Sequence, residues 1–222
     1  MGYLAYYAAW MFLSYALHSP WVMAGALAFF IFRPYIPDPW VVWKTFGRIR
    51  ALDAQIAANP ANVTARRDLA MLWLERLRPR RALELLDEAR KRAPNDPELL
   101  YLTGVARLRS GDAEGALEPL VKATELDPRV RFGEPYLIAA EALIALGRLE
   151  EAEDALERYV GVNSSSIQGF VRLSTVRRGR GDAPGARKAL DEALSTWSQL
   201  PRFRRRAELG WWVRAHAARL WS

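Results

Sequence analysis

The residue types that could do chemistry are few in this sequence and lie far apart. A zinc site needs clustered cysteine or histidine side chains, but the 222 residues include no cysteine and only two histidines, His18 and His216. A serine nucleophile needs a histidine base and is often carried on a GxSxG turn, which is absent. The pattern therefore predicts neither a metal site nor nucleophilic catalysis.

The other candidate sites have simpler interpretations. The sequence contains no phosphate-binding GxxxxGK[ST] or GxGxxG motif, and the glycines within 178–181 suit a turn between two helices. The serines at 164–166 fit a polar loop, and the acidic pairs at 150–151 and 191–192 fit solvated helix faces. We predict a protein that is not an enzyme and holds no cofactor; an enzyme with an unrecognised site is the alternative.

The regular spacing of several residue types indicates how the chain is organised. An Ala-x-x-x-Leu pattern recurs in steps of 34, 36 and 34 residues, at Ala82/Leu86, Ala116/Leu120, Ala152/Leu156 and Ala186/Leu190. Other columns follow nearly the same period: the prolines Pro60, Pro94 and Pro128, the glycines Gly111, Gly147 and Gly181, and the small residues Ala70, Gly104, Ala140 and Ser174. A fixed period of this length indicates stacked helical units, each burying its apolar face against its neighbours.

These columns resemble the tetratricopeptide repeat (TPR) family, whose pattern W-x₂-L-G-x₂-Y, A-x₃-F, P repeats every 34 residues. The match is best over 97–130, and the units are placed at 63–96, 97–130, 133–166 and 167–200. Trp73 occupies the aromatic position of the first unit, whereas Arg107 and Arg177 replace that aromatic in the second and fourth. Two extra residues near 129–132 lengthen one junction.

The resemblance implies an all-α fold, a right-handed superhelical stack of about four TPR helix pairs. It also implies a concave groove, lined by the first helix of each unit, that binds a peptide or a helix of a partner protein. Carried over position by position, the groove residues are Arg67, Met71, Leu74, Tyr101, Val105, Leu108, Leu137, Glu141, Ile144, Val171, Thr175 and Arg178. Packing between neighbouring helices is the alternative role for each of them.

The first 32 residues contain no Lys, Arg, Asp or Glu and are rich in aromatic and aliphatic side chains. A stack of helix pairs has no core wide enough to bury such a run, so we predict a membrane anchor over 1–36 that is not cleaved. Ser19-Pro20 suits the start of a second helix, which favours a hairpin; one kinked spanning helix and an interfacial arrangement are the alternatives. The predicted anchoring side chains are Tyr7, Trp10, Trp21, Phe29, Phe30, Trp40 and Trp43.

A linker follows over 37–62, with a Pro-rich start and then an amphipathic helix that ends near Asn59. Lys and Arg exceed Asp and Glu by two over 1–62, by none over 63–200, and by five over 201–222. The basic residues close behind the apolar run place the repeats in the cytoplasm of a bacterium, by the positive-inside bias; a periplasmic array is the alternative.

The last segment, 201–222, is basic and rich in tryptophan, and its apolar residues recur at helical spacing. We predict a helix that caps the exposed apolar edge of the last repeat, as repeat stacks require. A basic terminal patch within it could also contact anionic lipid or an acidic protein surface; its members are Arg202, Arg204, Arg205 and Arg206.

The sequence as a whole favours a protein-binding adaptor at the bacterial inner membrane, with other proteins, among them integral membrane proteins, as partners. The alternative is an accessory subunit of a large membrane complex, in which the apolar N-terminal helices pack on partner transmembrane helices. The sequence does not suggest nucleic-acid binding, because its positive charge is concentrated locally and no base-stacking module is recognisable.

Overall fold

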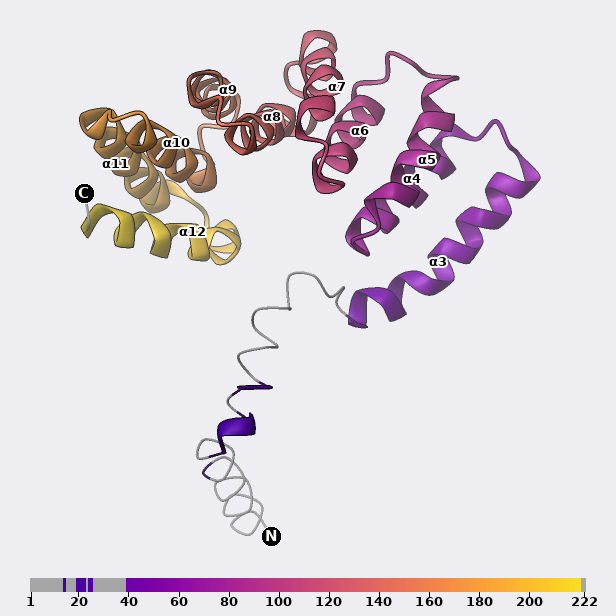
Figure 1. Cartoon of the computed structure of the whole chain (residues 1–222), viewed down its shortest axis with the longest axis horizontal. Helices are drawn as coiled ribbons and strands as arrows, with labels where there is room; N and C mark the ends of the chain where they lie inside the picture. Colours follow the sequence, from indigo (N-terminus) through magenta and orange to yellow (C-terminus); the bar gives the residue numbers. More distant parts are fainter. Residues whose placement is uncertain (1–13, 15–18, 23, 26–38, 221–222) are drawn as a thin grey trace.

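The computed structural model describes residues 14, 19–22, 24–25 and 39–220, and within these residues it is helical without any strand. The helices form an arch that ends in α3 and α12, with α6 and α8 on its inner side and α7 and α9 on its outer side (Figure 1). The elements are α3 Pro39–Ala58, α4 Val63–Glu75, α5 Pro79–Arg90, α6 Pro97–Arg109, α7 Ala113–Leu126, η2 Val130–Gly133, α8 Glu134–Ala145, α9 Leu149–Val162, α10 Ile167–Gly179, α11 Ala183–Gln199 and α12 Arg202–Leu220.

The helix ends follow from local chemistry. The side chains of Asn62, Asp96, Asp112, Ser166 and Asp182 each accept a hydrogen bond from a backbone N–H in the first turn of the helix that follows them. Such caps satisfy donors that have no partner inside the helix, and each contributes about 1 kcal/mol. The glycine column falls in the turns inside the helix pairs, where Gly111, Gly147 and Gly181 have positive φ. The chain therefore encodes four antiparallel helix pairs, α4/α5 to α10/α11.

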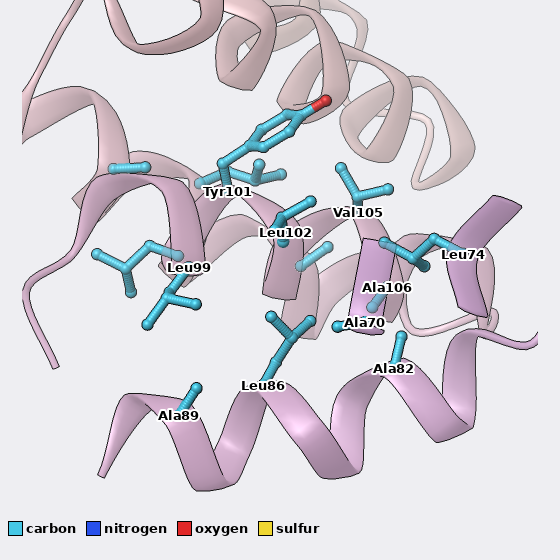
Figure 2. Packing of buried hydrophobic residues seen from close by; sticks show 14 of the residues in the cluster. Ala70, Leu74, Ala82, Leu86, Ala89, Leu99, Tyr101, Leu102, Val105 and Ala106 are labelled. Atoms are coloured by element: carbon cyan, nitrogen blue, oxygen red, sulfur yellow. The ribbon is translucent and has the colours of Figure 1, made fainter. Parts of the chain in front are cut away.

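The repeating alanine and leucine lie at the centre of each pair. All four copies of both are at most 1% exposed. Figure 2 shows Ala82 and Leu86 of α5 directed at Ala70, Leu99 and Ala106 of the two neighbouring first helices. A side-chain carbon at Gly104 would lie 2.4 Å from Cγ of Leu120, so the small residue permits the close approach of α6 and α7.

The buried residues form separate clusters along the arch. One cluster joins the first two helix pairs with the facing side of α8, another centres on α8 and α9, and a third joins α10, α11 and α12. A small fourth cluster packs Ile49 of α3 against Leu69 and Leu72 of α4. The core is thus a row of local contacts, as expected for stacked repeats.

The two extra residues of the sequence lie in η2, between α7 and α8. Arg131 and Phe132 have φ of 48° and 57°, and Gly133 follows with a φ of 80°. Left-handed backbone costs a non-glycine residue about 1–2 kcal/mol. This junction therefore differs from the others both in length and in backbone conformation.

The arginines at the family's aromatic position join the two helices of their pairs. Arg107 donates to the carbonyl oxygen of Gly115 at 2.7 Å, and Arg177 donates to that of Gly185 at 3.3 Å. In the first pair, the guanidinium of Arg81 lies 4.8 Å from the centre of the Trp73 ring. At this position the two helices of a pair are thus joined either by an arginine of the first helix or, in the first pair, by an arginine of the second helix that lies over the aromatic ring.

The two ends of the arch are the helices α3 and α12. The amphipathic helix predicted to end near Asn59 is α3, and the predicted terminal helix is α12, which packs on α10 and α11. Of the predicted anchor residues, Trp21 is exposed, whereas Tyr7, Trp10, Phe29 and Phe30 lie outside the described residues. No helix in the described part of the chain combines the length and the apolar character that a membrane crossing requires.

Candidate functional site

The twelve predicted groove residues lie on the first helices of the four pairs, but the structure divides them by accessibility. Five are buried between helices: Leu74, Tyr101, Val105, Leu137 and Val171. Four are half-buried, namely Arg67, Met71, Leu108 and Glu141, and three are exposed, namely Ile144, Thr175 and Arg178. For the buried five, the alternative of packing between helices describes their position better than groove lining does.

A ladder of charges runs across the first three units. Arg67 pairs with Glu98 at 2.9 Å, Glu98 with Arg131 at 3.4 Å, and Arg131 with Glu134 at 2.9 Å. The hydroxyl of Tyr101 donates to the Glu134 carboxylate at 2.7 Å, and Arg131 lies over the Tyr101 ring at 5.1 Å. Burial raises the pKa of Tyr101, and the hydrogen bond to Glu134 raises it further. The ladder links consecutive first helices by polar contacts.

The last unit carries a similar network that holds α12. Glu141 pairs with Arg172 at 2.6 Å, and the Arg172 guanidinium lies over the ring of Trp211 of α12 at 5.4 Å. Arg178 donates to the carbonyl oxygen of Ala218 at 3.2 Å. Two charged residues of α10 therefore contact α12, so that helix occupies one end of the inner face.

The four arginines of the basic terminal patch have different surroundings. Arg204 donates to the hydroxyl of Ser165 at 2.9 Å, and Arg205 donates to the carbonyl oxygens of Leu200 and Ser198. Arg202 and Arg206 are exposed. Two of the four predicted patch residues are thus held against the array, and two face solvent.

Two hollows lie away from the predicted groove residues. The larger, about 580 Å³, lies between α7, α8 and α9 and has apolar walls that include Leu120, Ala139 and Leu143. The smaller, about 480 Å³, is lined by Leu77, Arg78, Pro79, Arg80, Arg81, Arg109 and Ser110. The sequence does contain a signal for the smaller one, because arginine occupies positions 78, 80 and 81. No group of three or more potential metal ligands occurs in the described part of the chain.

Comparisons with known proteins find one family model and several solved structures that resemble this chain. The family model described as anaphase-promoting complex, cyclosome, subunit 3 matches residues 65–159. Among solved structures, MamA is 21% identical with a TM-score of 0.63, over 68% of this chain and 87% of that one. MamA 41-end from Desulfovibrio magneticus RS-1 is 24% identical with a TM-score of 0.55, over 60% of this chain and 75% of that one.

A third solved structure is YrrB, described as a TPR protein with an unusual peptide-binding site. It is 17% identical with a TM-score of 0.59, over 70% of this chain and 79% of that one. A comparison with curated protein sequences gave no match. The helix pairs, the residue columns and these likenesses together show that the chain has a helical stack of the tetratricopeptide repeat type.

Proposed function

We propose that this protein is an adaptor that binds a protein partner on the inner face of its repeat array and holds it at a bacterial inner membrane. The observation that carries the proposal is a row of accessible apolar side chains on successive first helices. Met71 of α4 and Leu108 of α6 are half-buried, and Ile144 of α8 is 38% exposed. Apolar anchors at repeated spacing suit an amphipathic helix or an extended peptide with hydrophobic side chains.

The charge ladder supports the same occupant. Its cations and anions are already paired with one another, so the inner face of the first three units offers no strong field of one sign. A partner segment would therefore gain affinity mainly from apolar side chains placed between paired charges. The peptide-binding site named for YrrB fits this type of partner.

The membrane part of the proposal rests on the sequence before α3 and on the first turns of α3 itself. Residues 1–32 carry no charged side chain, and Trp40 and Trp43 at the start of α3 are 63% and 71% exposed. Their ring centres lie 5.1 Å apart. Exposed tryptophans beside an apolar segment suit the membrane interface. We divide the chain into an anchor at 1–36, a linker at 37–62, four units at 63–200 and a cap at 201–222, with the array on the cytoplasmic side.

The second candidate is an accessory subunit of a large membrane complex. The specific observation in its favour is the outer face of α12, where Leu209 is 49% and Val213 is 52% exposed. An apolar strip on a terminal helix can continue the stack onto another protein. The two candidates differ in whether the anchor is needed for partner binding.

The groove is tested by two substitutions on the inner face. In Leu108→Glu/Ile144→Glu, charges replace two apolar anchors, and we expect the recovered partner to bind at least about 30-fold more weakly, since two anchors that each contribute at least about 1 kcal/mol are lost. The measurement is the amount of each protein recovered with full-length chain from membranes in mild detergent. Leu126→Glu, at the end of α7 and 46% exposed, is the control. Equal loss with the control, or recovery of an isolated monomer from the wild type, would contradict the proposal.

The anchor is tested by deleting residues 1–36. We expect the full chain to stay with membranes after alkaline carbonate washing and the shortened chain to move to the soluble fraction, because the uncharged run is removed. Partner recovery from the shortened chain then separates the two candidates: retained binding supports the adaptor, and lost binding supports the accessory subunit. Reporters fused at Gly2 and after Ser222 give the side of the array, and a periplasmic signal after Ser222 would overturn its cytoplasmic placement.

A further inference from the structure

The smaller hollow described above lies at the turn between α4 and α5 and is lined by four arginines. Arg78, Arg80, Arg81 and Arg109 contribute to its wall, and no carboxylate does. Four like charges around one hollow of about 480 Å³ repel each other, so a bound anion would be stabilised there. We refer to this hollow as the arginine pocket.

Two of the four guanidinium groups are held in position and two are available. Arg81 lies over the Trp73 ring at 4.8 Å, and Arg109 donates to the carbonyl oxygen of Leu74 at 3.2 Å. The side chains of Arg78 and Arg80 have no hydrogen-bond or ion-pair partner within the residues that the structure describes. Guanidinium groups with free donors are well suited to phosphate oxygens, which they can bind in a bidentate way.

In the later repeats, acids of the array itself neutralise the arginines at this edge. Glu114, near the start of α7, pairs with Arg148 at 3.5 Å, and Glu150, near the start of α9, pairs with Arg180 at 3.0 Å. Arg80 lies one repeat, 34 residues, before Glu114, so the first unit has a cation where the next two have an anion. In the second unit, Asp112 does not line the hollow and accepts from the backbone N–H of Gly115 as a helix cap. The first unit therefore lacks the compensation that its neighbours have.

The turn beneath the pocket also departs from the other units. Leu77 has a φ of 56° and is 41% exposed, whereas the corresponding turn positions of the next three units hold glycines with positive φ. A leucine in this left-handed conformation is strained, because its side-chain carbon crowds the following carbonyl oxygen. It also places an apolar side chain in the wall of a cationic pocket. A ligand with both a phosphate and an apolar part would contact both.

The position of the pocket in the fold indicates where such a ligand would come from. Arg76, next to Leu77, donates to the hydroxyl of Thr45 of α3 at 2.9 Å, so the pocket lies near the first turns of α3. Those turns carry the exposed Trp40 and Trp43, and six residues, 33–38, separate them from the uncharged run. Six residues span at most about 20 Å. If 1–32 lie in a bilayer, the pocket is within reach of the lipid headgroups.

We propose that the arginine pocket binds the phosphate group of an anionic phospholipid and so fixes the orientation of the array on the membrane. The proposal rests on the membrane anchoring proposed above. It deepens that role by giving the first repeat a lipid-binding function separate from the protein-binding inner face. Phosphate-binding arginines and an adjacent leucine match the headgroup and the start of the acyl region, respectively.

The experiment uses full-length chain in nanodiscs of phosphatidylcholine alone or with added phosphatidylglycerol, and measures amide hydrogen exchange. We expect the amides of 77–78, 80–82 and 109–111 to exchange about threefold or more slowly with phosphatidylglycerol, since a ligand present at twice its Kd reduces the unliganded, exchange-competent fraction about threefold. The protection should weaken as salt rises. Equal exchange in the two kinds of nanodisc would overturn the proposal.

Matched variants locate the effect. Arg78→Gln/Arg80→Gln removes two unpaired guanidinium groups and should abolish the added protection. Arg92→Gln/Arg129→Gln removes the same charge from exposed positions that follow α5 and α7, and it should leave the protection intact. If both double variants lose the protection equally, the lipid responds to net charge and the pocket is not a site.

Two further measurements distinguish failure of the lipid site from failure of the membrane anchoring, and distinguish a lipid from other anionic ligands. If full-length chain does not enter nanodiscs, the anchoring fails, and dispersed short-chain phosphatidylglycerol in detergent then tests the pocket alone, with the same protection expected. Protection by inorganic phosphate that equals protection by the lipid would refute a lipid site in favour of free phosphate. Loss of a recovered protein partner in Arg78→Gln/Arg80→Gln, without any lipid protection in the wild type, would instead assign the pocket to an acidic protein segment.

Discussion

Replacing Leu120 with alanine is expected to lower the free energy of unfolding by about 2–5 kcal/mol, because removing a buried leucine forfeits its transfer energy and leaves a cavity. Leu120 is fully buried in α7, in contact range of the backbone of α6 at Gly104. The measurement is urea denaturation followed by circular dichroism. Val121→Ala, one residue further and 50% exposed, is the control and should change the value by less than about 0.5 kcal/mol.

A substitution at Gly104 tests the same contact between α6 and α7. A methyl group at Gly104 would meet the end of the Leu120 side chain, so Gly104→Ala alone should cost about 1–3 kcal/mol by overpacking, despite the better helix propensity of alanine. In the double variant the new methyl group enters the space that Leu120 vacated. Its destabilisation should therefore be smaller than the sum of the two single effects. Additive effects would show that the two sites are not in the close contact described.

The second large effect is expected for Arg177→Met. Arg177 donates to Glu153 at 2.8 Å and also to Glu157, and both side chains of the first pair are largely buried, at 17% and 13% exposed. Methionine keeps much of the volume but leaves the Glu153 carboxylate with Arg180 as its remaining partner. Removing one partner of such a pair is costly, and with partial solvent screening we expect a loss of about 1–3 kcal/mol near neutral pH.

The pH dependence of that loss has a definite sign. Burial disfavours ionised Glu153, but the hydrogen bonds from Arg177 and Arg180 outweigh it and hold the pKa of this carboxyl below its ordinary value. A carboxyl with a lowered pKa in the folded protein stabilises it above the unfolded pKa, and this stabilisation is lost as the pH falls through the folded value. The cost of Arg177→Met should therefore shrink in acid. Urea titrations of both proteins near neutral pH and near about pH 3 measure it. A cost that is unchanged in acid would contradict the ion-pair explanation.

The array could be predicted from the sequence because its determinants repeat. The Ala and Leu columns report positions buried in every unit, and the glycine column marks turns with positive φ. Both constraints are local and steric, so they are visible without knowing the tertiary structure. The helix pairs and the cap-forming Asp112 and Asp182 follow from the same kind of local signal.

The site was less predictable, since accessibility depends on how neighbouring helices meet. Tyr101 and Val105 have groove positions in the family pattern, yet both are buried here. Arg131 takes part in the charge ladder only because the two extra residues of η2 place it near Glu98 and Tyr101. An insertion breaks the period, so no repeat column could assign its side chains a place.

The arginine pocket shows a different limit. Three of its four arginines are conspicuous in the sequence, at positions 78, 80 and 81. What the sequence does not give is that the side chains of Arg78 and Arg80 have no ion-pair partner among the described residues, because Arg148 and Arg180 are paired with acids in space. Only the positions of the acids on the neighbouring unit distinguish a neutralised cluster from an unneutralised one.

The division of the core into successive clusters has a mechanical consequence. Each cluster is held by neighbours in sequence, and the left-handed residues of η2 lie where the clusters of the first and second halves meet. A pulling force between the bilayer and a bound partner would pass through the junction at η2 and through each of the other contacts between helix pairs. The array should then lengthen stepwise, with one group of helix pairs giving way while its neighbours stay folded, and so act as an elastic tether.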